Sequence, residues 1–175
     1  MPVTVATWNV NSLRIRLQQV TDWLRSTEVD VLALQETKLT DPDFPREALE
    51  SLGYQVLFSG QKSYNGVALL SRWPCDSIVI DIPDFDDPPR RVLAATTNGW
   101  RVVNLYVPNG QSVGSEKYEY KLRWLAALQK WLEKEIRAHQ RLVVMGDFNI
   151  APEDQDVHDP AAWAGSVHVS EPERA

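Results

Sequence analysis

The chain has a single cysteine, Cys75, in 175 residues, so an intramolecular disulfide is excluded. An unpaired cysteine is typical of a protein in a reducing compartment. The first residues lack the basic and then apolar order of a signal peptide, and no apolar run approaches membrane-spanning length. We therefore expect a cytoplasmic protein that does not associate with membranes.

Positive charge is also scarce, because 18 Lys and Arg stand against 24 Asp and Glu and leave a net charge of −6. A basic surface is the usual footprint of nucleic-acid binding. The deficit is uneven, however: residues 153–175 carry −5 and residues 1–152 carry only −1. The net charge therefore does not exclude an anionic substrate for the first 152 residues.

Hydrophobic periodicity predicts an α/β protein whose sheets pack face to face with helices outside. Strands are expected at residues 3–9, 30–34, 54–59, 66–71, 77–82, 91–97, 101–107 and 142–145. The turn Asn98-Gly99 predicts a hairpin between two of them. After Pro152 the pattern fades, so we expect one domain over residues 1–157 and an acidic irregular tail over residues 158–175.

Three helices are expected, at residues 13–24, 45–52 and 116–138, with Ser12 as the N-cap of the first. In the longest helix the expected buried stripe consists of Leu122, Leu125, Leu132 and Ile136. Trp124 and Trp131 are interpreted as packing residues rather than as surfaces for base stacking.

Carboxylate, amide and phenol side chains occur where the expected strands end: Asn9, Glu36, Tyr106, Asp147 and Asn149. Residues 142–145 predict a strand buried on both faces, and it ends in Gly-Asp-x-Asn. Taken alone, that ending is an ordinary turn. However, a carboxylate at a buried strand end is costly unless it is paired or bound to metal, and Glu36 and Asp147 could meet at one sheet edge. Hard oxygen donors of this kind favour Mg²⁺ or Mn²⁺ over zinc, which indicates metal-assisted phosphate chemistry.

Five motifs in order resemble those of the exodeoxyribonuclease III family, within the endonuclease/exonuclease/phosphatase superfamily. They lie at residues 7–14, 34–38, 64–71, 104–110 and 146–150. The resemblance implies a four-layered α/β sandwich of two mixed sheets flanked by helices. It also implies hydrolysis of DNA phosphodiesters with a divalent metal, both as a 3′→5′ exonuclease on duplex DNA and as an apurinic/apyrimidinic endonuclease. The expected partner is double-stranded DNA, including abasic sites, and the protein is expected to be a monomer.

The resemblance also assigns roles to individual residues. Glu36 resembles the principal metal ligand, and Asn9 resembles a ligand or a partner of that ligand. Asp147 resembles the group that orients and deprotonates the attacking water, while Asn149 resembles the amide that holds Asp147 and the phosphate; both are also counted among the metal-site residues. Tyr106 resembles the phenol that hydrogen-bonds the phosphate. The residues expected to contact DNA are Asn11, Arg14, Lys38, Arg90 and Lys121, although a solvated surface position is an equal interpretation of Arg90.

Two motifs of the family, an Arg-Ile-Asp strand and a terminal Ser-Asp-His, do not occur in these residues. His139, His158 and His168 lie at a helix end and in the expected tail, and we assign them no substitute role. The sequence therefore reads as the N-terminal portion of such an enzyme, a sandwich incomplete at its C-terminus. For this portion alone we expect exposed apolar surface, poor solubility and little nuclease activity.

Two other functions remain open from the sequence. One is a phosphodiesterase or phosphatase of the same superfamily that acts on a substrate other than DNA, such as an inositol phosphate, sphingomyelin or RNA. The other is a catalytically incomplete fragment that at most binds DNA or metal.

Overall fold

Two four-stranded sheets carry the residues of interest in the computed structural model, which describes residues 2–86 and 89–175. The chain divides into two units. The first comprises Met1–Tyr106 and Glu135–Asp147, and it contains both sheets. The second comprises Val107–Lys134 and Phe148–Ala175.

The first sheet has the strand order β1-β2-β4-β3. Its strands are β1 (Val5–Asn9), β2 (Val31–Gln35), β3 (Gln55–Ser59) and β4 (Val67–Ser71). β1 and β2 are parallel, whereas β4 pairs antiparallel with both β2 and β3. Every residue of β2 and β4 is buried, as apolar runs at the centre of a covered sheet should be.

The second sheet has the order β5-β6-β7-β8. Its strands are β5 (Cys75–Ile80), β6 (Val92–Thr97), β7 (Trp100–Tyr106) and β8 (Leu142–Asp147). The predicted hairpin is confirmed, because β6 and β7 pair antiparallel with Thr97 opposite Trp100, and both turn residues have positive φ. β8 runs parallel to β7. The prediction that residues 142–145 are buried on both faces is wrong: β8 is an edge strand, and of its residues only Met145 is buried.

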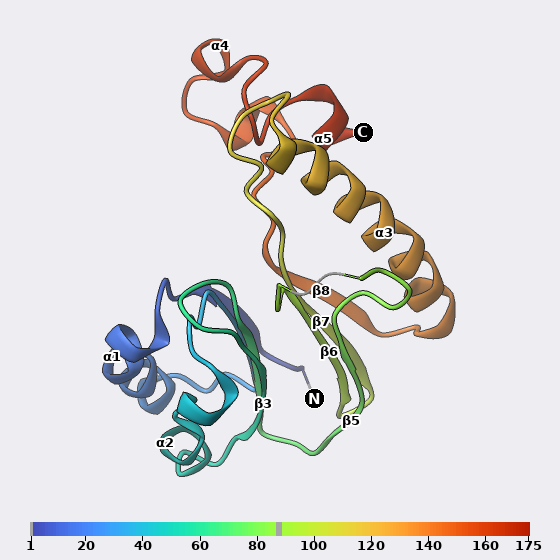
Figure 1. Ribbon diagram of the computed structural model, residues 1–175. Coiled ribbons are helices and arrows are strands. Elements are labelled where there is room, and N and C mark those ends of the chain that lie inside the picture. Colours follow the sequence, from blue (N-terminus) through green and yellow to red (C-terminus); the bar gives the residue numbers. More distant parts are fainter. Residues whose placement is uncertain (1, 87–88) are drawn as a thin grey trace. The chain divides into compact units, whose positions relative to one another are not determined.

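The first unit is layered, and the predicted α/β class with two mixed sheets and flanking helices is confirmed. Side chains of β2 and β4 pack against side chains of β6 and β7 between the sheets, among them Val31, Leu69, Leu93 and Val102. The other face of the first sheet is covered by α1 (Leu13–Ser26) and α2 (Arg46–Glu50) (Figure 1).

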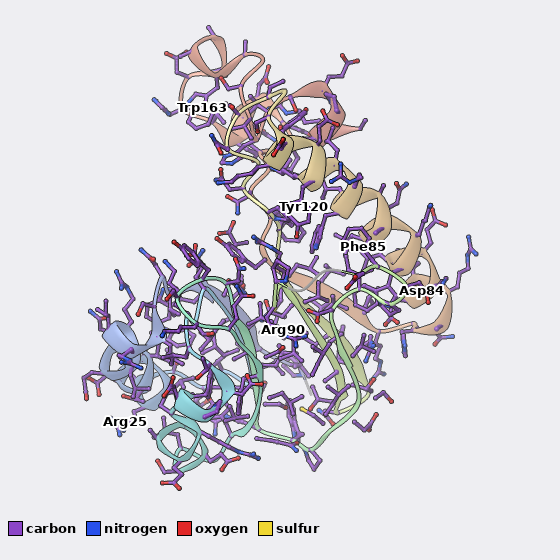
Figure 2. The ribbon with its side chains drawn as sticks, in the orientation of Figure 1. Arg25, Asp84, Phe85, Arg90, Tyr120 and Trp163 are labelled. Atoms are coloured by element: carbon purple, nitrogen blue, oxygen red, sulfur yellow. The ribbon has the colours of Figure 1, made fainter. Side chains whose placement is uncertain are left out.

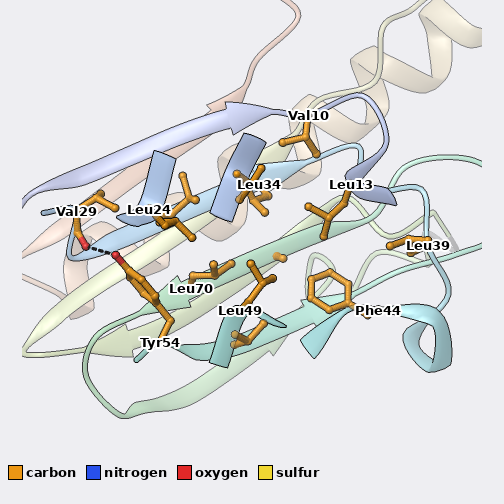
Figure 3. Close-up of a cluster of buried hydrophobic side chains, with 14 residues drawn as sticks. Val10, Leu13, Leu24, Val29, Leu34, Leu39, Phe44, Leu49, Tyr54 and Leu70 are labelled. Carbon is orange, nitrogen blue, oxygen red and sulfur yellow. Dashed lines mark hydrogen bonds between the residues drawn. The ribbon is translucent and has the colours of Figure 1, made fainter. Parts of the chain in front are cut away.

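The cluster beneath α1 and α2 is apolar apart from one hydroxyl (Figure 3). The Tyr54 hydroxyl donates to the Val29 carbonyl at 2.7 Å, which satisfies this buried polar group. Helix α1 begins where we expected, but Ser12 makes no side-chain cap hydrogen bond. Its φ of +91° places it in a left-handed conformation instead. The expectation of a conventional N-cap is therefore corrected.

Helix α3 (Glu116–Ala138) has the predicted bounds, but the predicted buried stripe is wrong. The buried residues are Tyr118, Lys121, Trp124, Leu128 and Trp131, whereas Ile136 is 63% exposed. The spacing of three and four residues is helical, but the buried face is the one adjacent to the predicted leucine stripe, and large aromatic side chains occupy it. The interpretation of the two tryptophans as packing residues agrees with their burial.

Residues 158–175 contain two short helices, α4 (Pro160–Trp163) and α5 (Glu171–Arg174). The predicted domain boundary at residue 157 stays a prediction. None of the helices in residues 2–86 and 89–175 is long and apolar enough to cross a membrane.

Candidate active site at the ends of four strands

Four predicted site residues lie where strands end in the first unit. Asn9 is the last residue of β1, and Glu36 directly follows β2. Tyr106 and Asp147 end β7 and β8 and lie opposite one another in the parallel register. Parallel neighbours end at the same edge of a sheet, so each pair of strands delivers its polar residues together.

The Asn9 side chain joins the two carboxylates. Its Nδ2 donates to Glu36 Oε1 at 2.8 Å and to Asp147 Oδ2 at 2.7 Å. An amide nitrogen carries two hydrogens, so one group serves both acceptors. Asn9 Oδ1 in turn accepts from the backbone N–H of Asn11 at 3.0 Å, which fixes the orientation of the amide. The two carboxylate oxygens therefore lie within two hydrogen-bond lengths of each other.

Glu36 is held as an anion. Burial alone raises its pKa, but hydrogen bonds from Asn9 and Lys38, the charge of Lys38 and a hydrogen bond from Tyr106 outweigh burial and lower the pKa below its ordinary value. Lys38 Nζ lies 2.9 Å from Glu36 Oε2. A carboxylate that stays charged near neutral pH can neutralise a cation.

Tyr106 is held in its neutral form. Burial, followed by the charge of Glu36 and the hydrogen bond to it, raises the pKa of Tyr106 to about 12, although Arg91 opposes the shift. The Arg91 guanidinium lies over the Tyr106 ring at 4.8 Å, and its Nη1 donates to the Tyr106 carbonyl at 3.2 Å. Tyr106 is therefore an O–H donor over the whole physiological pH range.

The backbone around Glu36 is strained. Glu36 and Lys38 have φ values of +54° and +56°, a region that is costly for residues with a Cβ. Hydrogen bonds hold this conformation: Ser12 N–H donates to the Glu36 carbonyl at 2.7 Å, and Thr37 N–H donates to the Gly66 carbonyl at 3.1 Å. Gly66 is required here, since a Cβ on it would lie 2.2 Å from Thr37 Oγ1. Strain of this kind concentrates at functional sites.

A close approach of two strands explains why the Gly-Asp-x-Asn ending begins with glycine. A Cβ on Gly146 would lie 1.9 Å from the Leu105 carbonyl oxygen of the neighbouring strand. Glycine thus lets β8 approach β7 closely just before Asp147, where the carboxylate must reach Asn9.

Asn149 belongs to the second unit. Its Nδ2 donates to the Val107 carbonyl at 3.0 Å, and its Oδ1 accepts from Asn109 Nδ2 at 3.5 Å. Asn109 Nδ2 also lies 3.0 Å from His168 Nε2. The sequence singled out neither Asn109 nor His168. Asn109 lies within a motif and could have been found there, whereas only folding places His168 beside it.

The expected DNA contacts differ in exposure. Asn11 and Arg14 are exposed, the Lys38 side chain is 27% exposed beside Glu36, and the Arg90 side chain is 43% exposed and paired with Asp81 at 2.5 Å (Figure 2).

Lys121 is 0% exposed, and within the second unit its Nζ donates to Glu173 Oε1 at 2.5 Å and to the Asn149 carbonyl at 2.6 Å. A lysine buried in this way presents no charge to DNA, so the expectation of a DNA contact at Lys121 is corrected.

The donor set fits a hard divalent cation. Glu36 and Asp147 offer carboxylate oxygens, and Asn9 holds them together through its amide nitrogen. Mg²⁺ commonly takes one or two carboxylates and keeps water or phosphate oxygens in its other positions. Within the part of the chain that the structure describes, no group of three His, Cys, Asp or Glu residues could hold a metal. Two converging carboxylates leave most positions around a cation open, which is suited to a metal that shares its ligands with a substrate.

Residues 6–168 match the Endonuclease/Exonuclease/phosphatase family. The chain belongs to this family. The resemblance inferred from five motifs is thereby confirmed, and proteins similar to the chain include an exodeoxyribonuclease III and AP endonucleases.

Three proteins are similar to this chain in sequence or in structure. Exodeoxyribonuclease III of Haemophilus influenzae is 39% identical over 156 residues, which cover 86% of this chain and 58% of that protein. The structure of the 3′ phosphatase NExo from Neisseria, bound to a product DNA hairpin, has a TM-score of 0.97 and 45% identity, and the match covers 99% of this chain and 68% of that one. The structure of an AP endonuclease from Archaeoglobus fulgidus has a TM-score of 0.92 and 38% identity, covering 99% of this chain and 67% of that one. The chain thus spans somewhat less than two thirds of the curated relative.

Proposed function

We propose that the protein is a DNA-repair nuclease that hydrolyses DNA phosphodiester bonds with Mg²⁺ or Mn²⁺. The activities proposed are 3′→5′ exonuclease on duplex DNA and apurinic/apyrimidinic endonuclease. One observation carries the proposal: the Asn9 amide gathers the carboxylates of Glu36 and Asp147, and the Tyr106 hydroxyl donates to Glu36 beside them. Carboxylates that converge with a neutral O–H donor suit the hydrolysis of a phosphodiester.

Each group has a separate task. Glu36 and Asp147, held together by Asn9, would bind the divalent cation, which when bound neutralises charge on the phosphate oxygens. Asp147 orients a water and accepts its proton as the water oxygen attacks phosphorus, while the bond from phosphorus to the leaving sugar oxygen breaks and that oxygen takes a proton from solvent. When the phosphate is bound, Tyr106 turns its hydroxyl hydrogen from Glu36 to a phosphate oxygen, and its raised pKa keeps that hydrogen in place.

DNA is the proposed substrate because the relatives named above act on it or bind it. In addition, Asn11 and Lys38 lie on the loops around Glu36, and Arg14 lies in the first turn of α1. The Neisseria relative, named a 3′ phosphatase, favours a second candidate, which is removal of a 3′ phosphate from DNA by the same residues. We propose further that the protein acts in a reducing, cytoplasmic environment, as its single cysteine indicates, and that it acts as a monomer.

The test measures Mg²⁺-dependent turnover of three DNA substrates: a duplex with an abasic site, a blunt duplex and a duplex with a 3′ phosphate. A non-DNA panel of inositol phosphate, sphingomyelin and RNA is measured beside them. The Glu36→Gln variant should lose activity, whereas Glu50→Gln on the exposed face of α2 should keep it.

Calorimetry with Mn²⁺ separates the alternatives. Binding by the parent and not by Glu36→Gln supports the metal site. If metal binds and only the non-DNA panel is cleaved, the substrate class is wrong. If metal binds and nothing is cleaved, the chain is catalytically incomplete, and equal binding by both proteins overturns the site itself.

A further inference from the structure

Two buried amides lie directly behind the carboxylates. Asn104 is in β7, two residues before Tyr106, and Gln35 ends β2, one residue before Glu36. Asn104 is 0% exposed and Gln35 is 1% exposed. The reaction proposed above uses neither residue, and an asparagine is unexpected in the apolar run Val102-Val103-Asn104-Leu105.

The Asn104 side chain bonds the second sheet to the first. Its Nδ2 donates to the carbonyl oxygens of Leu34 and Ala68, both at 2.9 Å, and its Oδ1 accepts from Gln35 Nε2 at 2.7 Å. Leu34 and Ala68 are opposite one another in the β2–β4 register. One side chain of β7 therefore hydrogen-bonds to two strands of the other sheet at residues that pair with each other, and it uses both amide hydrogens.

Gln35 carries the connection one strand further. Its Nε2 also donates to Thr7 Oγ1 at 2.9 Å, and Thr7 lies in β1 two residues before Asn9. The amide pair thus connects β1, β2 and β7. In each of these strands the hydrogen-bonded residue lies within two positions of the site residue, which is Asn9, Glu36 or Tyr106.

Packing alone does not account for an amide here. The space between the sheets is otherwise filled by apolar side chains such as Leu69, Leu93 and Val102, and an apolar residue would avoid the desolvation of a polar group. A fully satisfied buried polar network instead fixes one relative position of the elements that it joins.

We propose that Asn104, together with Gln35, is a positioning residue that sets the register between the two sheets at the site, so that Glu36 and Tyr106 meet. The catalytic part of this inference rests on the proposed function, whereas the structural part does not.

The chain contains a matched control. Ser71 Oγ and Thr97 Oγ1 form another buried hydrogen bond between the sheets, at 2.7 Å. Ser71 pairs with Val31 at the start of β2, the end of the strand opposite Glu36. Loss of this bond weakens the contact between the sheets without touching the site.

The experiment compares Asn104→Leu with Thr97→Val by hydrogen exchange at the amides of Ser12, Thr37 and Lys38, which hold the Glu36 loop. We expect exchange at these amides to be at least about tenfold faster in Asn104→Leu and changed by less than about twofold in Thr97→Val. In the cleavage assay kcat should fall about 10²-fold in Asn104→Leu with little change in KM, since misplaced groups affect chemistry more than binding.

Two further variants secure the result. If Asn104→Leu does not fold, Gln35→Met removes the same amide–amide hydrogen bond by changing the other partner. The double variant Gln35→Asn with Asn104→Gln exchanges the two amides and should restore the slow hydrogen exchange of the loop. Unchanged exchange in Asn104→Leu, or equally fast exchange in Thr97→Val, would overturn the inference. Faster exchange confined to Asn104→Leu, in a chain that cleaves nothing, supports the positioning role and counts against the proposed function alone.

Discussion

Among single residues, the proposed cleavage depends most directly on Asp147. Asp147→Asn keeps the size of the side chain and an oxygen that can accept from Asn9, but it removes the group that takes a proton from water. We expect kcat to fall about 10²–10⁴-fold while DNA affinity is retained. Single-turnover cleavage and fluorescence anisotropy measure the two quantities. Asp22→Asn, on the exposed face of α1, is the control, and a rate for Asp147→Asn close to the parent rate would show that Asp147 does not activate the water.

The sequence predicted residues of the site better than it predicted their surroundings. Glu36 and Asp147 could be paired in advance, because strand ends meet at sheet edges and carboxylates there need a partner. Lys121 could not be distinguished from a surface lysine, because its burial depends on Glu173, which lies 52 residues further along the chain. Asn104 was passed over for a related reason: nothing local shows that its amide faces the other sheet.

At the scale of elements, the junction of β7 and β8 depends on Gly146. In Gly146→Ala the new Cβ would collide with the Leu105 carbonyl, so β8 must move away from β7. We expect the free energy of unfolding to fall by about 3 kcal/mol, the upper range for overpacking. Chemical denaturation measures this loss.

Gly99→Ala is the matched control for that substitution. Gly99 also has a positive φ, of +74°, but no atom lies within 4 Å of the added Cβ. Its cost should be only the conformational penalty of about 1 kcal/mol. Equal losses in the two variants would show that the close approach of the strands is not what requires glycine at position 146.

The helix α5 is predicted to be sensitive to acid through Glu173. Burial raises the pKa of Glu173, but hydrogen bonds from Lys121, Ser170 and the His168 backbone, with the Lys121 charge, lower it below the ordinary value. The stabilisation is therefore present above the ordinary pKa and is lost as the pH falls through the folded-state pKa.

Glu173→Gln should reveal that contribution. At neutral pH it leaves the Lys121 charge without its buried partner, and we expect a loss of about 3 kcal/mol. The stability of this variant should then decline less steeply than that of the parent between about pH 6 and pH 3. Urea denaturation across this range measures both effects. Glu171→Gln, an exposed change in the same helix, should follow the parent, and parallel declines in the parent and Glu173→Gln would contradict the assignment.

Local patterns predicted the existence of the elements well, but not their environment. The hairpin at Asn98-Gly99 and the bounds of α3 follow from short-range turn chemistry and helical periodicity. The edge position of β8 does not, because the apolar run Leu142–Met145 looks the same whether a strand has one neighbour or two. The buried face of α3 was misassigned because leucines were weighted above the larger Tyr118, Trp124 and Trp131.

At the scale of the whole molecule, most of the net negative charge lies after residue 152, so DNA affinity should depend on a few positive groups near the site. Arg14→Gln removes an exposed charge from the start of α1, and Arg25→Gln removes one from its last turn (Figure 2). The slope of log affinity against log salt should become shallower by about 0.9 for Arg14→Gln, the value of one phosphate contact, and stay unchanged for Arg25→Gln. Titrations at several salt concentrations decide this, and identical slopes for both variants would exclude Arg14 from the DNA contact.

The left-handed backbone at Glu36 implies a conflict between thermal stability and activity. Asparagine tolerates a φ of +54° better than glutamate or glutamine does. We expect Glu36→Asn to melt at a higher temperature than Glu36→Gln, because both variants lose the charge that pairs with Lys38 and only asparagine relieves the backbone. Equal melting temperatures would refute this. Among variants that no longer bind metal, a laboratory search for heat resistance would therefore favour asparagine at position 36.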